Sequence, residues 1–402
     1  MGFSSWADGP GFYISPRWRC DPVPMTETTD QITIRSSPLA EVHKQLHAKM
    51  SEEGEWSLPS SYGDTAAEYK VVREGGAGLI DLSPRGRIEV DGSEAVQFLN
   101  GLITNDVKTL EPGTWMGAAF PNVQGRLLAE VRVLRLQDGR FLFDTEATST
   151  ERVLKTLERF TLAGDFRVKD LTEEIALISV QGQGAGDVVR LLFGEEASRL
   201  DRGRVGPLNW KDRPLHFIRA SHTAEDGFDF YVSAADGASL WDAFLNSGAR
   251  PVGYEALDIL RIEAGVPRYG VDMDETNVVL EAVADDAVSF TKGCYVGQEI
   301  IARIHWRGHV AKKLTGLRFD DVGETKAGDK IATADAKEIG RLTSITFSPQ
   351  LGALIALGYV KYDYLAPGTA VRVLASESEL AAHVVEFPFV RGSWYDGVSD
   401  KL

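Results

Sequence analysis

The sequence changes character near Gly308, and this change constrains the fold more than any other feature. Before it, strand-like runs alternate with amphipathic helices. After it, the chain holds short strand-like runs separated by Gly, Pro and Asp, at residues 314–319, 338–347, 355–359 and 370–374. Short strands in close succession are typical of a small all-β module. The 402 residues also exceed one ordinary core. We therefore expect an α+β domain over residues 38–307 and a β-barrel domain over residues 308–402.

The first domain is predicted to mix helices with antiparallel strands. Asp138-Gly139 between two alternating apolar runs is a strong hairpin signal. The runs on either side, residues 127–136 and 140–144, should be its strands. Apolar residues spaced by three or four predict amphipathic helices. The strands and helices expected elsewhere in this domain are strands at 78–83, 87–90, 175–180, 216–219 and 229–233, and helices at 38–50, 93–102, 150–160 and 254–264.

Residues 1–37 are predicted to form a disordered extension. They contain Gly, Pro and Ser but no apolar region of the kind found in secretory signals. Met25 is an alternative start, which would remove Cys20 and leave Cys294 as the single cysteine. Two cysteines so far apart provide neither a disulfide framework nor a CxxC metal site. We therefore expect a reducing, cytoplasmic environment.

The charge and apolar patterns exclude several classes of partner. A formal net charge of -16 disfavours a phosphate backbone as a general partner, so no nucleic acid is expected. No apolar stretch approaches the roughly 20 residues of a membrane helix, so no membrane partner is expected. The glycine-rich run at 182–187 lacks the third glycine of a dinucleotide fingerprint. We interpret it as a turn between a strand and a helix.

The run at residues 291–299, Thr-Lys-Gly-Cys-Tyr-Val-Gly-Gln-Glu, places Cys294 between two glycines and close to Lys292. A helix is expected to begin near Gln298, so Cys294 would lie just before a helix N-terminus. The positive end of that helix and the Lys292 ammonium would both favour a thiolate. The alternative is a buried, inert cysteine. Cys294 and Lys292 are the catalytic candidates.

Several motifs resemble those of the folate-dependent aminomethyltransferase superfamily, which includes the glycine cleavage T protein. The resemblance covers nearly all of the chain after residue 38. Within this superfamily, the run Lys292-Gly-Cys-Tyr-Val-Gly-Gln-Glu299 is similar to the YgfZ branch of folate-binding proteins. The other motifs that carry the resemblance are Gly78-Leu-Ile-Asp-Leu-Ser, Asn100-Gly-Leu-Ile-Thr-Asn-Asp-Val107, Ala224-Glu-Asp-Gly-Phe228, Arg261-Ile-Glu-Ala-Gly265 and Arg268-Tyr-Gly270.

The resemblance implies a ring of mixed α/β subdomains around a pterin cavity, followed by a β-barrel. It implies tetrahydrofolate, or a one-carbon-substituted folate, as the cofactor. The expected function is support of iron-sulfur cluster assembly or repair through folate and Cys294. The expected partners are folate and iron-sulfur client or assembly proteins.

The resemblance also suggests residues that contact the folate, each with a simpler alternative. Asp229 could accept hydrogen bonds from the pterin or be a solvated strand residue, and Glu225 lies in the loop before it. Asn105 and Asp106 belong to a superfamily motif but also suit a turn that ends a helix. Arg303 and Arg307 suit a folate glutamate tail, an acidic partner or a solvated face. His305 and His309 are not expected to bind a metal, because Gly308 interrupts the helix.

Three departures from the T-protein pattern put transfer chemistry in doubt. In T proteins a carboxylate on the strand matching residues 124–130 faces the folate, and here Leu128 and Ala129 are expected in its place. Glu130 is the alternative carboxylate on this strand, and it is expected on the same face as Leu128 but at a different depth. Asp229 stands where a glutamate is usual, and Leu257 replaces an arginine. A tetrahydrofolate-dependent aminomethyltransferase or methyltransferase is therefore the alternative, and a folate-binding scaffold without chemistry is a third possibility.

Overall fold

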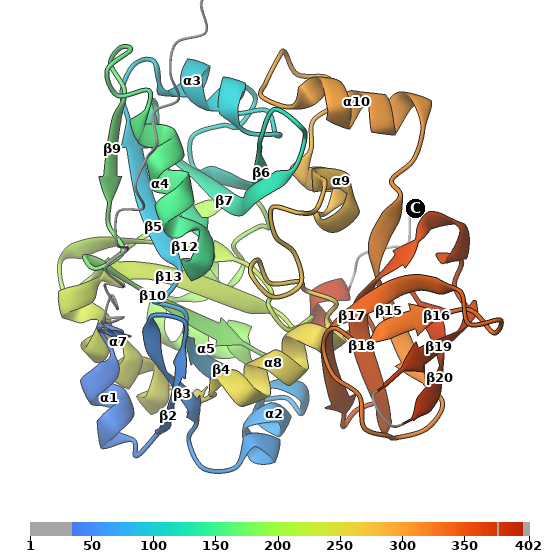
Figure 1. Cartoon of the computed structure of the whole chain (residues 1–402). Coiled ribbons are helices and arrows are strands. Elements are labelled where there is room, and N and C mark those ends of the chain that lie inside the picture. Colours follow the sequence, from blue (N-terminus) through green and yellow to red (C-terminus); the bar gives the residue numbers. More distant parts are fainter. Residues whose placement is uncertain (1–33, 376–377, 397–402) are drawn as a thin grey trace, which may run out of the picture. The chain divides into compact units, whose positions relative to one another are not determined.

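The structure is a computed structural model that describes residues 34–375 and 378–396 (Figure 1). Cys20 and the alternative start at Met25 lie outside these residues. Within them, no helix is long and apolar enough to cross a membrane. Two large, mainly antiparallel sheets, a small sheet and a closed barrel organise the described residues, and the predicted α+β class with a C-terminal β-barrel is confirmed.

A six-stranded sheet forms the base of the first domain. Helices α1 (Ala40–Gln45), α5 (Ala185–Phe193) and α7 (Ala234–Asn246) cover one of its faces and bury side chains such as Val42, Val188 and Trp241. The short α6 (Glu195–Ser198) follows α5. The strand order is β11 (Val205–Trp210), β12 (Arg213–Arg219), β13 (Gly227–Ser233), β10 (Ile175–Gln181), β4 (Gly78–Asp81) and β14 (Arg250–Pro251).

A five-stranded sheet forms the second layer. Helices α3 (Ala95–Leu102) and α4 (Thr150–Glu158) cover its outer face, where Leu99 and Leu157 join a core with Phe141 and Phe143. The predicted hairpin around Asp138-Gly139 joins two of its strands. The strand order is β6 (Thr114–Pro121), β7 (Leu127–Gln137), β8 (Arg140–Thr145), β5 (Gly86–Asp91) and β9 (Arg167–Asp170).

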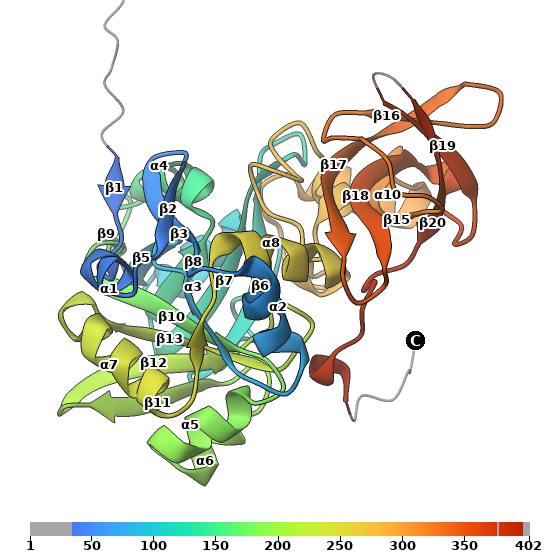
Figure 2. The same cartoon turned by 90° about the horizontal axis from the view of Figure 1, so that it is seen from below.

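The two large sheets share a core where their inner faces meet. Leu134 and Leu142 of the five-stranded sheet join Leu177 and Ile218 of the six-stranded sheet. Leu260 of α8 (Tyr254–Glu263) completes this core. A three-stranded sheet of β1 (Arg35–Ser36), β3 (Trp56–Ser61) and β2 (Lys49–Glu53), together with α2 (Thr65–Arg73), lies beside α8 (Figure 2).

The C-terminal barrel is closed. Its interior is filled by apolar side chains that alternate along the strands, among them Leu317, Ile331, Ala356 and Val373. The strand order is β15 (Lys312–Phe319), β18 (Ala353–Lys361), β17 (Glu338–Ser348), β16 (Lys330–Ala332), β19 (Ala370–Leu374) and β20 (Glu379–Val385). Before the barrel come α9 (Val279–Ala282) and α10 (Gln298–Arg307).

Buried hydrogen bonds fix the barrel against α8. Arg261 of α8 donates to Asp272 Oδ2 at 2.5 Å and to Ser344 Oγ of β17 at 2.7 Å. Thr343 and Ser344 of β17 both donate to Asp272 Oδ1 at 2.6 Å. Because these groups are nearly inaccessible to water, losing one partner would leave the others unsatisfied. These hydrogen bonds therefore fix the positions of α8 and the barrel, which both line the cavity described below.

One predicted helix is shorter in the structure. The apolar spacing predicts a helix over residues 38–50, but α1 ends at Gln45 and the chain turns through His47, whose φ is 54°. Met50 lies instead in β2, where it pairs with Pro59 of β3 and is 39% exposed. Strand pairing therefore overrides the helical spacing here, because the last apolar position is not needed for the core.

Candidate functional site

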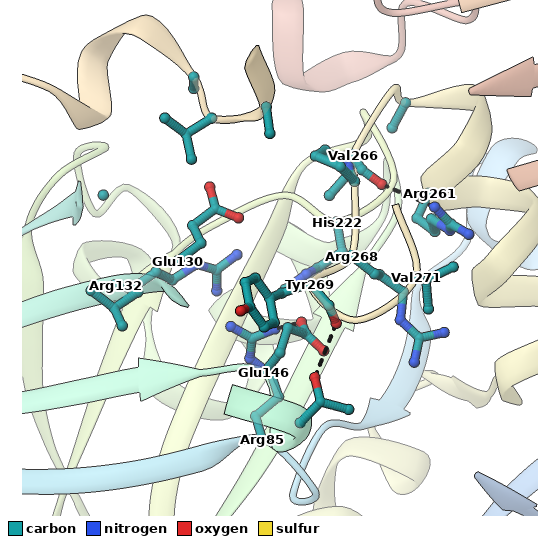
Figure 3. A pocket seen from close by; sticks show the side chains of 18 of the residues that line it. Arg85, Glu130, Arg132, Glu146, His222, Arg261, Val266, Arg268, Tyr269 and Val271 are labelled. Carbon is teal, nitrogen blue, oxygen red and sulfur yellow. Dashed lines mark hydrogen bonds and ion pairs between the residues drawn. The ribbon is translucent and has the colours of Figure 1, made fainter. Parts of the chain in front are cut away.

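A cavity of about 1160 Å³ opens between the five-stranded sheet, α8, the segment after α8 and the barrel. Figure 3 shows side chains around it, with Glu130, Arg132 and Tyr269 among them. Pockets for drug-sized ligands usually span roughly 300–1,000 Å³. The cavity is therefore large enough for such a ligand. Its polar and aromatic lining includes Arg85, Trp115, Glu130, Arg132, Glu146, His222, Tyr254, Arg268 and Tyr269.

Strand alternation along β7 brings two charged side chains to this cavity. Ala129, Val131 and Val133 are buried in the core under α3 and α4. Glu130 and Arg132 point to the opposite face and line the cavity. Leu128 and Ala129, which were expected in place of the T-protein carboxylate, do not line the cavity, whereas Glu130 of the same strand does. The sequence pattern gives the face of Glu130 correctly, but not how far its side chain reaches.

Glu130 extends its carboxyl group into the cavity (Figure 3). This carboxyl group forms no hydrogen bond or salt bridge with any of the residues that the structure describes. Burial raises the pKa of Glu130 to about 7, although Arg85 and Arg132 act in the opposite direction. A carboxyl group with such a pKa can take up or release a proton near neutrality.

Two buried aspartates lie behind the cavity wall and hold the cations that line it. Asp144 Oδ1 accepts a hydrogen bond of 2.6 Å from Arg85 Nε. Asp229 Oδ2 accepts one of 2.6 Å from Arg132 Nη1 and pairs with His222 Nε2 at 2.9 Å. Both aspartates are inaccessible to solvent, and Arg85 also contacts Glu146. The cavity therefore meets cations and an imidazole, not the aspartates themselves.

Asp229 remains ionised in this arrangement. Burial alone would raise its pKa, but His222 and Arg132 hold the pKa of Asp229 well below its usual range. Both of its oxygens have partners within the protein, since Oδ1 lies 3.2 Å from His222 Nε2. Asp229 is thus neither a solvated strand residue nor part of the cavity lining.

An aromatic and apolar side completes the lining. Trp115 of β6, Tyr254 and Leu257 of α8 and Tyr269 contribute to it. The Tyr254 hydroxyl donates to the Asp81 carbonyl at 2.9 Å, and burial raises the pKa of Tyr254 well above its ordinary value. Arg132 lies 5.7 Å from the centre of the Trp115 ring. Flat rings beside fixed charges suit a planar heteroaromatic ligand.

The two catalytic candidates lie apart from the cavity lining. Cys294 is exposed, in the loop before α10. Lys292 is buried, and its Nζ donates to the carbonyls of Ile103 and Asn105 at 2.8 and 2.5 Å. Burial lowers the pKa of Lys292 to about 8. In the described part of the chain, no hydrogen bond joins Lys292 to Cys294.

Glu225 holds the C-terminal segment of the described chain. Its carboxylate accepts hydrogen bonds of 2.8 Å from Arg73 Nη1 and of 2.7 Å from Ser393 Oγ. Only 3% of its side chain is exposed. The Ser393 backbone N–H also donates to Glu225, at 2.8 Å. Glu225 does not line the cavity.

The remaining four candidates also lie outside the cavity lining. Asn105 Nδ2 donates to the carbonyls of Gly117 and Asp286, both of which line the cavity. Asp106 Oδ1 accepts from the Lys108 backbone at 3.0 Å. Arg303 and Arg307 lie on the exposed face of α10. Arg303 forms a salt bridge of 3.4 Å with Glu299, which is also exposed.

Sequence reasoning missed most of the polar residues that line the cavity. One signal was available, because Glu130 and Arg132 are charges at alternating positions of an otherwise apolar strand. His222 carried no such signal. Within the described ranges, no group of three or more His, Cys, Asp and Glu side chains could hold a metal ion.

Comparison with known proteins agrees with this architecture. A family model described as the GCVT N-terminal domain matches residues 39–292, and one described as the glycine cleavage T-protein C-terminal barrel domain matches residues 312–391. The aminomethyltransferase of Symbiobacterium thermophilum is 33% identical over 370 residues, covering 89% of this chain and 98% of the relative. That of Rubrobacter xylanophilus is 34% identical over 362 residues, covering 89% and 95%. The crystal structure of aminomethyltransferase T from Bartonella henselae superposes with a TM-score of 0.83 at 25% identity, covering 89% and 98%.

Proposed function

We propose that this chain, which belongs to the glycine cleavage T-protein family, binds tetrahydrofolate in the cavity beside β7 and carries out a one-carbon transfer of the aminomethyltransferase type. The observation that carries this proposal is the carboxyl group of Glu130, which lies in the cavity and has no partner among the described residues. This chain matches nearly the whole length of the relatives named aminomethyltransferase, which supports the same conclusion.

Glu130 has the properties of a group that handles a proton. Its pKa is raised to about 7 by burial, so near neutral pH both protonation states are populated. As a carboxylate it can hold a proton released at the cavity, and as a carboxylic acid it can donate one. The cations Arg85 and Arg132 keep its charged form accessible, because each carries a positive charge close enough to lower the pKa. Glu130 would therefore replace the carboxylate that the T-protein pattern places at Leu128 or Ala129, one or two residues earlier on this strand.

The lining fits a folate chemically. Trp115, Tyr254 and Tyr269 offer flat surfaces to a pterin. Arg268 and Lys313 offer cations to the carboxylates of a glutamate tail. Bound tetrahydrofolate would supply the amine that receives the one-carbon unit. The protein would exclude water, orient the ring and hold or move a proton at the Glu130 carboxyl group.

A second candidate function is maintenance of iron-sulfur proteins, with folate and Cys294 acting together. The observation that favours it is the exposed thiol of Cys294 in a loop whose sequence resembles the YgfZ branch. The loop is held by buried Lys292, so the thiol is presented from a fixed segment. Because Cys294 lies outside the cavity lining, this function would use a second surface of the protein.

Ligand binding and turnover test the first proposal. We expect tetrahydrofolate to bind the wild-type protein in titration calorimetry. Glu130→Gln should bind it comparably but lose about 100-fold in the rate of one-carbon transfer. Glu299→Gln is the matched control, because Glu299 is an exposed carboxylate on α10. Failure of the wild-type protein to bind tetrahydrofolate would contradict the proposal.

Complementation tests the second candidate. Cells that lack the gene would receive the wild-type chain, Cys294→Ala or Glu130→Gln, and a labile [4Fe-4S] enzyme would be assayed under oxidative stress. Rescue by the wild type and by Glu130→Gln, but not by Cys294→Ala, would establish the thiol-dependent function. Rescue by Cys294→Ala would exclude it.

A further inference from the structure

His222 places a titratable ring on the wall of the cavity. The residue lies in the loop between β12 and β13, and its backbone N–H donates to the buried Gln181 Oε1 at 2.9 Å. Only 8% of the residue is exposed, and it lines the cavity. Figure 3 shows His222 among the lining side chains. The loop anchor and the burial give the ring a defined position.

Asp229 determines that the Nε2 nitrogen of the His222 ring carries a proton. His222 Nε2 lies 2.9 Å from Asp229 Oδ2 and 3.2 Å from Oδ1. An ionised carboxylate can only accept hydrogen bonds, so Nε2 must carry a proton. The other ring nitrogen, Nδ1, has no hydrogen-bond partner among the residues that the structure describes. The imidazole therefore has one nitrogen free to bind a ligand.

We infer that His222 contacts the ligand through Nδ1, which accepts a hydrogen bond from the N–H edge of the bound pterin, and that Asp229 is its positioning residue. This inference rests on the proposed function. The family resemblance gives Asp229 itself the role of acceptor, but the ion pair with Arg132 removes it from the cavity. The acceptor at the cavity is then an imidazole in place of a carboxylate.

This exchange makes ligand binding depend on pH. A neutral imidazole accepts at Nδ1, whereas an imidazolium donates there and repels an N–H edge. Tetrahydrofolate should therefore bind more weakly as the pH falls. The charged and titratable groups that line the same cavity or lie close to the Asp229–Arg132 pair come from several elements. They are Asp229 and Tyr231 of β13, Glu130 and Arg132 of β7, Asp144 of β8, Arg85, Glu146 and Tyr395.

The charge of Glu130 changes near neutral pH, so Glu130 must be replaced to isolate the contribution of His222. The experiment therefore compares four proteins in the Glu130→Gln background. These are Glu130→Gln alone and its combinations with His222→Gln, with Asp229→Asn and with His216→Gln. His216 of β12 is a matched control, because it is a partly buried histidine that does not line the cavity. Asp229→Asn keeps the shape but can donate to Nε2, which moves the ring proton to Nδ1.

Titration calorimetry with tetrahydrofolate at about pH 5.5 and about pH 8 gives the first readout. Glu130→Gln and its His216→Gln control should bind about tenfold more tightly at the higher pH. The His222→Gln and Asp229→Asn combinations should lose that difference and bind about tenfold more weakly at about pH 8. If the His222→Gln combination kept the difference of about tenfold between the two pH values and bound as tightly as Glu130→Gln alone at about pH 8, the inference would be overturned and the proposed function left intact.

The second readout needs no ligand. Two-bond ¹H–¹⁵N correlation spectra of histidine-labelled protein report which ring nitrogen is protonated, and the His222→Gln variant identifies the signal. We expect His222 in the Nε2–H form, and in the Nδ1–H form after Asp229→Asn. An Nδ1–H form in the wild-type protein would overturn the assignment of Asp229 as the positioning residue. No binding of tetrahydrofolate by the wild-type protein would overturn the proposed function and the pterin contact together, whatever these spectra show.

Discussion

Arg132 donates a 2.6 Å hydrogen bond to Asp229 Oδ2 across the junction of the two large sheets. Arg132 also lies 3.7 Å from Asp144, so its charge is shared between two buried carboxylates. Glu130, two residues before it on the same face of β7, has no such partner within the described residues. The ion pair of Arg132 with Asp229 thus leaves Glu130, and not Asp229, as the carboxyl group that reaches the cavity. The ionised Asp229 is paired with Arg132 behind the wall, and Glu130 remains available for chemistry.

The raised pKa of Glu130 predicts a stability that depends on pH. The folded protein holds the Glu130 proton up to about pH 7, whereas a glutamate in the unfolded chain releases it near its ordinary pKa of 4.5. Stability from this group is therefore complete at low pH and is lost as the pH rises to about 7. Glu130→Gln should be more stable than the wild type above pH 7, by on the order of 1–3 kcal/mol. Urea unfolding between pH 5 and pH 8 measures this, and parallel profiles for the two proteins would contradict it.

Lys292 and Cys294 should differ in their contribution to stability. Lys292→Met leaves two backbone carbonyls without their buried donor, those of Ile103 and Asn105. We expect a loss of about 1–3 kcal/mol in the free energy of unfolding. Cys294→Ala, at an exposed position, should change it by less than about 0.5 kcal/mol. A destabilised Cys294→Ala protein would show that the cysteine is structural.

The loop that carries Cys294 depends on one glycine. Gly297 has φ of 78°, and a Cβ there would lie 2.3 Å from the Asn122 carbonyl oxygen. Gly297→Ala should therefore destabilise the protein by about 2 kcal/mol or more. Gly293→Ala is the control in the same loop, because a Cβ there meets no atom within 4 Å. Thermal unfolding compares the two variants, and equal melting temperatures would contradict this account of the loop.

The parts of the fold that could be predicted from the sequence are those set by interactions between residues close together in the chain. The hairpin of β7 and β8 follows from local turn chemistry at Asp138-Gly139, and the barrel follows from its short strands. Two-residue strands such as β14 left no local pattern, because β14 exists only through pairing with β4, far away in the sequence. Pairing partners of this kind are set by tertiary structure.

In the candidate site, too, local patterns could be predicted and long-range contacts could not. Alternation along β7 predicts the face of Glu130, but its reach into the cavity depends on the barrel and α8, which no local pattern describes. Asp229 was predicted to contact a pterin or solvent. It is buried, and its partners are Arg132, 97 residues earlier in the chain, and His222. The charge balance of a buried residue therefore could not be read from its own strand.

A buried ionic network should hold the first domain to the barrel. Arg73 binds Glu263 at 2.7 Å and Glu225 at 2.8 Å, while Ser348 of the barrel donates to Glu263. Arg73→Met would leave two buried carboxylates without a cation. We expect a loss of about 3–5 kcal/mol in the free energy of unfolding. Arg303→Met is the exposed control and should change it by less than about 0.5 kcal/mol, as urea unfolding can show.

The measurement that tests the central claim most directly is formation of 5,10-methylenetetrahydrofolate by the purified protein. The donor would be an aminomethylated lipoyl carrier protein, and wild type, Glu130→Gln and Cys294→Ala would be compared. We predict product with the wild type and with Cys294→Ala, and a rate about 100-fold lower with Glu130→Gln. No product with the wild-type protein, or an undiminished rate with Glu130→Gln, would contradict the assignment of Glu130 as the proton-handling group of a transferase.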